Sequence, residues 1–200
     1  MFQQLTRPFA FLGIQHPDAL LRWVRWWLPL ILASLLTGAV LAVKGLDVYG
    51  NEGLFAKLLN FLQSLPGFYL AALAAVSTFP SKAMDEFMPG IPPTARIVYN
   101  GALTEVKLSR RRMLCMLFAY LTALSFIITL ALIFATSFAS PLSAVLDGAA
   151  RSGVRAVGVF IVFALTAQLL IITLWGLFYL GERVHTPDSS ANGKNEPSSD

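Results

Sequence analysis

The chain has 200 residues, of which 56% are hydrophobic and 13% are charged, fewer charged residues than the about 25% of typical soluble domains. The charged residues leave four uncharged runs, at residues 26 to 43, 58 to 81, 113 to 146 and 156 to 181. Each run reaches the roughly 18 to 20 apolar residues that a helix needs to cross a bilayer. This pattern argues against a soluble helical core, because soluble helices carry a polar stripe along one face.

The formal net charge of +4 could suggest a nucleic-acid surface, but a membrane topology explains the placement of the basic residues better. If the four runs are spans, most of the 15 Lys and Arg residues fall on the side that holds both termini. The basic residues on the other side are Lys44, Lys57, Arg151 and Arg155. Because Lys and Arg near spans are retained in the cytoplasm, we expect both termini inside and no nucleic-acid partner.

The N-terminal part is expected to enter the membrane gradually. Residues 1 to 15 mix apolar residues with Arg7 and Pro8, which suits a stretch lying at the interface. A helix should begin at Ala19, capped by Asp18, and lead into a first span at residues 26 to 43. Pro29 should kink this helix. Removal of the segment as a signal peptide, by cleavage at the end of the span, is the alternative.

The second span is expected at residues 58 to 79, after an outer loop that is rich in Gly, Asp and Asn. Pro66 and Gly67 should bend this span, since proline removes one helical hydrogen bond. We interpret the bend as a packing kink. A hinge or a pore element is the alternative.

Residues 80 to 112 form the longest polar segment between spans and are expected to be a basic, proline-rich cytoplasmic loop. Turns and extended geometry are favoured around its central residues, Met88, Pro89, Pro92 and Pro93. From residue 103 to residue 112 the sequence favours a helix that runs directly into the third span.

Four basic residues stand directly before the third span: Lys107, Arg110, Arg111 and Arg112. Each basic residue near an anionic leaflet contributes about 1 kcal/mol, so we expect the cluster to contact anionic lipids of the bilayer. A docking site for a soluble, acidic cytoplasmic protein, assisted by the proline-rich residues, is the sharper alternative. The acidic pair Asp85 and Glu86 is expected to bond basic residues of the loop or of this cluster, folding the loop back onto the membrane face.

The third span is expected at residues 113 to 138 and should end near Pro141. After a short outer turn, the fourth span follows at residues 156 to 180. Residues 1 to 181 would therefore form one four-helix transmembrane domain. The tail at residues 184 to 200 is rich in Ser, Pro and Asn and is expected to be disordered.

Small residues recur at four-residue spacing in three of the spans: Ser34, Gly38 and Ala42; Gly67, Ala71 and Ala75; Ala131, Ala135 and Ala139. Such faces let helices approach closely, and packing within one chain is favoured here over contact between copies in a homo-oligomer. Gln168 is the most polar residue deep within a span. It is expected to bond a hydroxyl of a facing helix, such as that of Thr122, Ser125 or Thr129, or its counterpart in another copy. A polar pore constriction is the alternative.

The sequence lacks the patterns that support catalysis. It has no nucleotide-binding, metalloprotease or hydrolase motif, and Cys115 is its single cysteine. No acidic or basic residue lies deep within the expected spans, which argues against a proton-coupled transporter. We therefore expect no enzyme, no metal and no cofactor.

The expected fold is all-α: a polytopic integral membrane protein with four transmembrane helices and both termini inside. The charge asymmetry favours the bacterial cytoplasmic membrane as its location. The first functional hypothesis is a non-enzymatic scaffold or sensor subunit that recruits or regulates a soluble cytoplasmic protein, as an accessory of a bacterial membrane or defence system. The alternative is an oligomeric pore-forming or membrane-perturbing effector.

Overall fold

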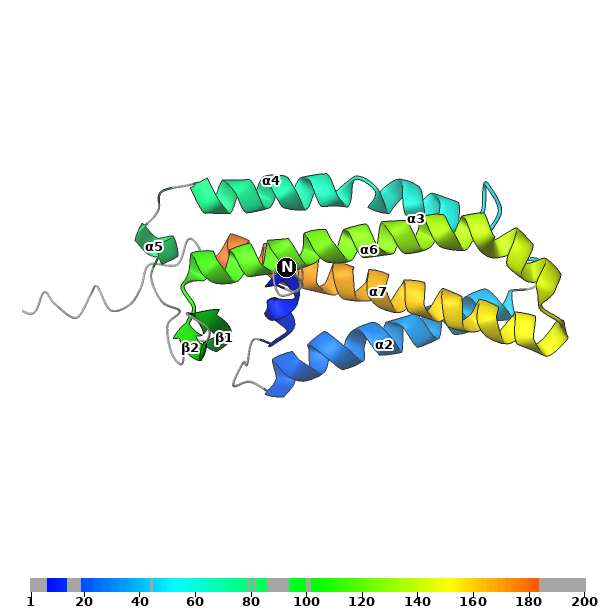
Figure 1. Cartoon of the computed structure of the whole chain (residues 1–200), viewed down its shortest axis with the longest axis horizontal. Coiled ribbons are helices and arrows are strands. Elements are labelled where there is room, and N and C mark those ends of the chain that lie inside the picture. The colour runs from blue at the N-terminus through cyan, green and yellow to red at the C-terminus, as the bar shows by residue number, and fades with distance from the viewer. Residues whose placement is uncertain are drawn as a thin grey trace, which may run out of the picture.

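The computed structural model describes residues 7–13, 19–43, 45–78, 80, 82–85, 94–99 and 102–183. Its elements, labelled in Figure 1, are the 3-10 helix η1 (Arg7–Gly13), the helices α2 (Ala19–Ala42), α3 (Leu54–Leu62), α4 (Leu65–Thr78) and α5 (Lys82–Asp85), the strands β1 (Thr94–Tyr99) and β2 (Ala102–Lys107), and the helices α6 (Arg110–Val145) and α7 (Gly148–Arg183). The predictions for Met88, Pro89, Pro92 and Pro93 and for the tail at residues 184 to 200 lie outside the described residues.

Long helices run side by side along the molecule in alternating directions (Figure 1). Helix α6 packs against α3 and α4 on one side and against α7 on the other, and α2 packs against α7. The elements α5, β1, β2 and η1 gather at the end of the bundle where α6 begins, and the loop between α2 and α3 lies at the opposite end. We call these the α5 end and the loop end.

Three helical segments are long and apolar enough to cross a membrane: Leu54–Thr78, Arg110–Leu142 and Gly148–Leu180. The apolar part of α2 within the described residues, Trp26–Ala42, is shorter. The chain is therefore an α-helical membrane protein with three helices of spanning length. The predicted all-α class holds for the bundle, to which the structure adds one small hairpin.

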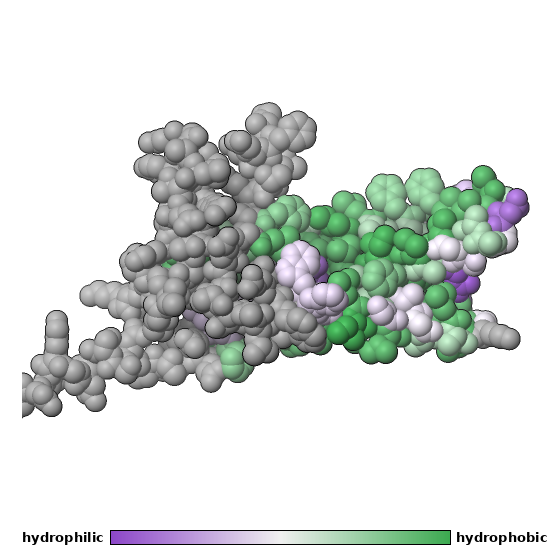
Figure 2. All heavy atoms as spheres, turned by 90° about the horizontal axis from the view of Figure 1, so that it is seen from below, coloured by the Kyte–Doolittle hydropathy of each residue, from purple (hydrophilic) through white to green (hydrophobic). Residues whose placement is uncertain are grey.

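The surface of the bundle is apolar, as lipid-facing helices require. Figure 2 shows hydrophobic side chains covering most of the coloured face of the molecule. Large apolar side chains are exposed on several helices, among them Leu35 at 67%, Phe68 at 65% and Leu174 at 66%. In water such a surface would cause aggregation, whereas in a bilayer it contacts acyl chains.

The second expected span is broken, but three residues before the predicted bend at Pro66 and Gly67. Helix α3 ends at Leu62, and α4 begins at Leu65 after the turn residues Gln63 and Ser64. Pro66 then lies in the first turn of α4, where its missing N–H would have had no helical partner. The proline therefore helps to start α4, and the break itself lies before it.

Helix α6 does not stop at Pro141, where the third span was expected to end, but continues to Val145, while its segment of spanning length ends at Leu142. A proline removes a single helical hydrogen bond, and the bonds of neighbouring turns persist, as the 3.2 Å bond from Leu146 N to Leu142 O shows. Only Leu146 and Asp147 separate α6 from α7. Helix α2 begins at Ala19 as predicted. It continues through Pro29, where a kink was expected, without a break in the helix.

A β-hairpin occupies much of the segment that was expected to be helical before the third span. Strands β1 and β2 pair antiparallel with Thr94 opposite Lys107 and Tyr99 opposite Ala102. The helix predicted from residue 103 was therefore wrong in its first half, and α6 starts at Arg110. The sequence between the strands is Asn-Gly, the dipeptide that most favours a two-residue hairpin turn.

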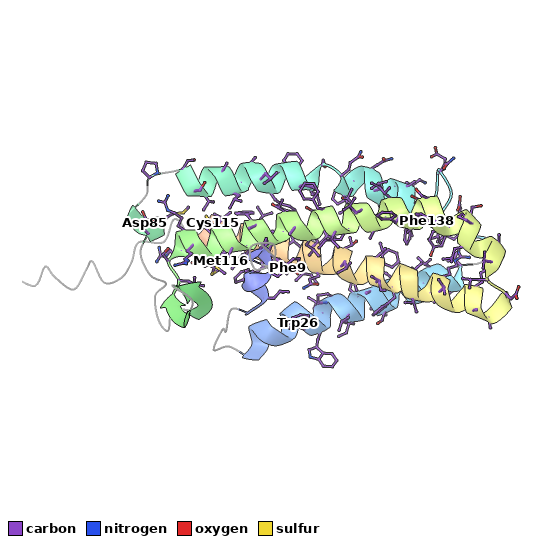
Figure 3. The ribbon with its side chains drawn as sticks, in the orientation of Figure 1. Phe9, Trp26, Asp85, Cys115, Met116 and Phe138 are labelled. Atoms are coloured by element: carbon purple, nitrogen blue, oxygen red, sulfur yellow. The ribbon has the colours of Figure 1, made fainter. Side chains whose placement is uncertain are left out.

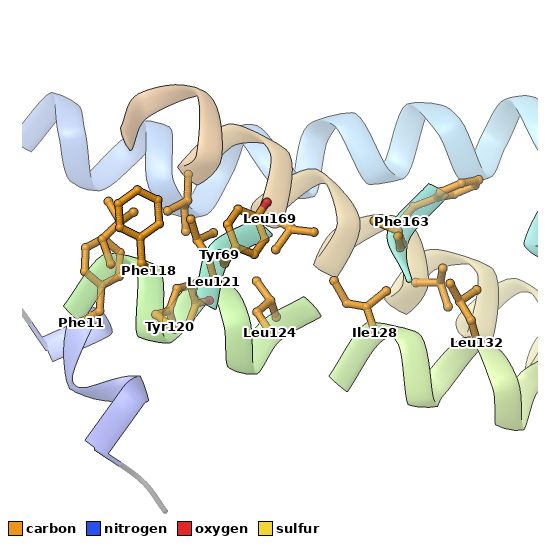
Figure 4. Close-up of a cluster of buried hydrophobic side chains, with 14 of the residues drawn as sticks. Phe11, Tyr69, Phe118, Tyr120, Leu121, Leu124, Ile128, Leu132, Phe163 and Leu169 are labelled. Atoms are coloured by element: carbon orange, nitrogen blue, oxygen red, sulfur yellow. The ribbon is translucent and has the colours of Figure 1, made fainter. Parts of the chain in front are cut away.

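The core follows one face of α6. Leu117, Leu121, Ile128 and Leu132 of α6 are fully buried, and Leu169 of α7 is fully buried with them. Figure 4 shows this cluster, with Tyr69 of α4 reaching into it from the other side. The Tyr69 hydroxyl shares a 2.7 Å hydrogen bond with the Thr173 hydroxyl, which links α4 to α7.

The small-residue faces are used less within the chain than predicted. Gly38 is exposed, and a Cβ added to it would have no neighbour within 4 Å. The other members of its set, Ser34 and Ala42, are also exposed, as are Gly67 and Ala71 of the second set. The residues of α2 that are buried lie on a different face, at Ala33, Thr37 and Val40. The face formed by Ser34, Gly38 and Ala42 therefore does not pack against another helix of the same chain.

Candidate docking surface at the α5 end

Helix α6 begins with a capping serine. The Ser109 hydroxyl accepts a 3.4 Å hydrogen bond from the backbone N–H of Arg112, and the Ser109 backbone is extended. This cap places Arg110, Arg111 and Arg112 in the first helical turn. Positive charge at a helix N-terminus opposes the helix dipole by about 0.3 to 1 kcal/mol, so the turn gains from a nearby acidic group.

Asp85 supplies that acidic group. The Nε of Arg111 donates to Asp85 Oδ1 at 2.7 Å, and Nη2 donates to Asp85 Oδ2 at 3.0 Å. The Nη1 of Arg111 also donates to the carbonyl oxygen of Ser77 at 3.3 Å, near the C-terminus of α4. Arginine near a helix C-terminus satisfies carbonyls that lack helical partners. One guanidinium therefore joins the end of α4, α5 and the start of α6, and we call this contact the Arg111 clamp.

Of the pairings that were open to Asp85, the structure contains the one with the arginine cluster. Figure 3 shows Asp85 on α5, at the end of the bundle where α6 begins. The Arg111 side chain is 21% exposed and that of Asp85 is 63% exposed, so the pair lies at the edge of the packed region. The prediction for Glu86 lies outside the described residues.

The members of the basic cluster have different surroundings. Arg110 is buried at 6% exposure, Arg111 is held in the clamp, and Arg112 is exposed. Lys107 is the last residue of β2, and its side chain lies outside what the structure describes. Of the three arginines, Arg112 is the one placed to meet a partner or a lipid headgroup.

An N-terminal aromatic anchor adds to this end of the bundle. Phe11 of η1 stacks on Tyr120 of α6 with ring centroids 5.4 Å apart, and Phe9 contacts the same ring edge-on at 6.0 Å. Phe11 and Tyr120 are both buried, and Figure 4 shows the two rings together. Helix η1 also packs against β1. The α5 end is thus a folded surface built from four separate stretches of the chain.

Sequence reasoning missed two parts of this end, the Ser77 carbonyl and the aromatic anchor. The carbonyl is a backbone group, so no residue type signals it. The sequence does contain a signal for the anchor. Phe9 and Phe11 lie two residues apart next to Pro8, and two aromatic rings so close together need a large apolar partner. Tyr120, eight residues after Arg112, offers such a ring from α6.

The predicted hydrogen bond from Gln168 to a hydroxyl of α6 is not formed with Thr129. Its side chain on α7 is half-buried, and the hydroxyl of Thr129 is buried without a hydrogen-bond partner, so these two are not bonded. The hydroxyls of Thr122 and Ser125 donate at 2.8 Å to carbonyls of their own helix. A polar link between two of the long helices is formed instead by Tyr69 of α4 and Thr173 of α7.

The chemistry available at the α5 end is charge pairing and hydrogen bonding. Within the described ranges, no three His, Cys, Asp or Glu side chains lie close enough together to hold a metal ion. Comparisons with protein-family models, with curated proteins and with solved structures found no match to the chain. The fold itself therefore defines the class, an α-helical membrane protein.

Proposed function

We propose that the protein is a non-enzymatic scaffold or sensor subunit of the bacterial cytoplasmic membrane that recruits or regulates a soluble cytoplasmic protein. The observation that carries this proposal is the Arg111 clamp, which fixes α5 and the end of α4 to α6 beside an exposed Arg112. A fixed surface binds a partner at a lower entropic cost than a flexible loop. An accessory role in a bacterial membrane or defence system fits this activity.

The proposal includes four spans with both termini in the cytoplasm. Helix α2 has 24 residues, which extend about 36 Å at 1.5 Å per residue and match about 30 Å of hydrocarbon with its interface. Arg22 and Arg25 lie near its start in sequence. Basic residues at both this start and the start of α6 support a cytoplasmic α5 end.

The partner surface is expected to be acidic. Arg112 is exposed beside the clamp, and complementary charge speeds association and selects partners more than it raises affinity. Anionic lipid headgroups contact the same cluster when the partner is absent, because each basic residue gains about 1 kcal/mol near an anionic leaflet. The lipid surface and the partner would thus compete for Arg112.

An oligomeric pore is the second candidate. The observation that favours it is the exposed face of Ser34, Gly38 and Ala42, which is suited to close contact between copies. Within one chain the interface between α6 and α7 is filled by side chains such as Leu121, Ile128 and Leu169, so a conduit would have to form between copies. The scaffold is preferred because the α5 end is built and the pore needs a second chain.

A crosslinking experiment in cells tests the scaffold. A photo-reactive side chain at the exposed position 80 should capture a soluble protein, and Arg112→Glu should abolish the capture. Lys57→Glu, the same charge reversal at the loop end, is the matched control and should leave the capture intact. Capture that survives Arg112→Glu would refute the assigned docking surface.

A further inference from the structure

A pocket lies at the loop end, opposite the Arg111 clamp. Its volume is about 670 Å³, within the range of about 300 to 1,000 Å³ typical of ligand sites. Its walls come from the last turns of α6, the first turns of α7 and the loop at residues 49 to 51. The α6–α7 hairpin and a loop about 85 residues earlier in the chain thus line one cavity.

The floor and sides of the pocket are apolar. Ala135 and Ala139 of α6 line it, together with Phe138, Leu142 and Val154. Figure 3 places Phe138 on the part of α6 near the loop end. The small side chains at Ala135 and Ala139, one helical turn apart, leave room that larger residues would fill. The third small-residue face therefore shapes a cavity in addition to packing helices.

The charged side chains among the described residues that line the pocket are both cationic. Arg151 and Arg155 both line it and, being four residues apart on α7, lie on the same helical face. No acidic residue is among the described residues that line the pocket. The nearby Asp47 carboxylate accepts a 2.8 Å hydrogen bond from Gly50 N, which is a local turn contact. The lining therefore carries two positive charges beside an apolar wall.

The loop wall is held in place before any ligand arrives. Leu54 N bonds Asp47 O and Phe55 N bonds Val48 O, each at 3.0 Å. The Tyr49 hydroxyl donates to the Arg155 carbonyl at 3.5 Å, and the ring of Tyr49 packs edge-on against Phe55 at 5.0 Å. A Cβ at Gly53 would meet the Gly50 backbone at 2.9 Å, so the turn requires glycine there. Such a fixed wall lowers the ordering cost of binding.

We propose that this pocket binds an anionic glycerophospholipid, with its phosphate between Arg151 and Arg155 and one acyl chain along the apolar wall. Guanidinium groups bind phosphate oxygens in pairs of charge-assisted hydrogen bonds. A small water-soluble anion would use the two arginines but not the apolar wall. The combination of both surfaces at one site selects an amphiphile, and it does so independently of the docking proposal.

Lipid binding to the purified full-length protein in a neutral detergent tests the site. Native mass spectrometry with phosphatidylglycerol and phosphatidylcholine of equal chain length should show tighter binding of the anionic lipid. The double variant Arg151→Gln and Arg155→Gln should weaken phosphatidylglycerol binding by about tenfold or more, because charge-assisted bonds contribute about 1.5 to 3 kcal/mol. Lys57→Gln, which removes an exposed charge outside the pocket, should leave the affinity unchanged.

A second variant separates the site from the stability of the loop. Arg155 also donates to the Leu46 carbonyl at 3.4 Å, so its loss could loosen the loop. Ala139→Phe fills the apolar wall without changing charge, and it should weaken binding of the same lipid. Unchanged affinity in either the double variant or Ala139→Phe would overturn the proposal. Displacement of the lipid by glycerol 1-phosphate at equal concentration would also overturn it, because the apolar wall would then contribute nothing.

Discussion

Breaking the Arg111 clamp should loosen the α5 end without unfolding the bundle. Asp85 is 63% exposed, so its ion pair with Arg111 contributes only about 0.2 to 1 kcal/mol. The hydrogen bond from Arg111 to the Ser77 carbonyl adds about 1 kcal/mol, since it satisfies a carbonyl near the end of α4. Arg111→Ala should therefore cost about 1 to 2 kcal/mol locally, and Asp85→Asn less than about 1 kcal/mol.

Hydrogen exchange measures this loosening directly. A local loss of about 1.4 kcal/mol raises the opening constant about tenfold, so amides in the last turn of α4 and in α5 should exchange about tenfold faster in Arg111→Ala. Arg112→Ala is the matched control, because Arg112 is exposed and outside the clamp. Adding Asp85→Asn to Arg111→Ala should cause little further change. Equal effects of Arg111→Ala and Arg112→Ala would refute the clamp. The arginines would then act only through their total charge.

Three further predictions concern other parts of the bundle. Tyr69→Phe removes the hydrogen bond to Thr173 and should destabilise the folded protein by about 0.6 kcal/mol, measured by unfolding in mixed detergent. Leakage of ions and dye from liposomes that carry the Gln168→Leu protein should equal leakage from liposomes that carry the unaltered protein. Burial raises the pKa of Tyr49 above its ordinary value of 10.0, and the nearby Arg155 guanidinium partly offsets this, so the absorbance difference between the unaltered protein and Tyr49→Phe should titrate above pH 10.0. Titration of Tyr49 should not change the free energy of unfolding below that pH and should lower it above, because the unfolded chain loses the proton first.

Each of these outcomes has a control or a contrary result. Thr173→Val removes the same bond together with the 2.7 Å bond from its hydroxyl to the Leu169 carbonyl, so adding Tyr69→Phe to Thr173→Val should cause no further loss. Strong leakage from unaltered protein alone, reduced by Gln168→Leu, would favour the pore. A tyrosine titration at or below the ordinary value would contradict the burial of Tyr49 against Phe55.

The sequence predicted the features that depend on composition along the chain. Apolar length identified the long helices α6 and α7, and the start of α2 at Ala19 followed from the capping signal at Asp18. The pairing of Asp85 with the arginine cluster was also expected. Which arginine takes part was not predictable, because it depends on where the end of α4 lies relative to the first turn of α6.

Features that depend on local context were predicted less well. The Asn-Gly sequence before Ala102 is a strong hairpin signal, although a helix was predicted from residue 103. Pro66 and Pro141 were both treated as helix breakers. Proline is compatible with a first helical turn, as at Pro66, and a long helix with stable neighbouring turns continues through it, as at Pro141.

The use of small residues was hidden for a different reason. Spacing places Ser34, Gly38 and Ala42 on one face of a helix, but it does not say which neighbour that face meets. Helix α2 packs against α7 through Ala33, Thr37 and Val40 instead, rotated away from the predicted face. The pocket at the loop end was likewise not predictable, since it needs α6, α7 and the loop in place together.

The sidedness of the bundle tests the central claim most directly. In a Cys115→Ser background, single cysteines at the exposed positions 51 and 80 can be labelled in intact cells with a membrane-impermeant thiol reagent. Asn51→Cys and Pro80→Cys remove no basic residue, so the distribution of Lys and Arg that sets the orientation in the membrane is preserved. The proposed topology predicts that Asn51→Cys is labelled in intact cells and that Pro80→Cys is labelled only after the membrane is opened. Labelling of Pro80→Cys in intact cells would place the α5 end outside and contradict a cytoplasmic docking surface.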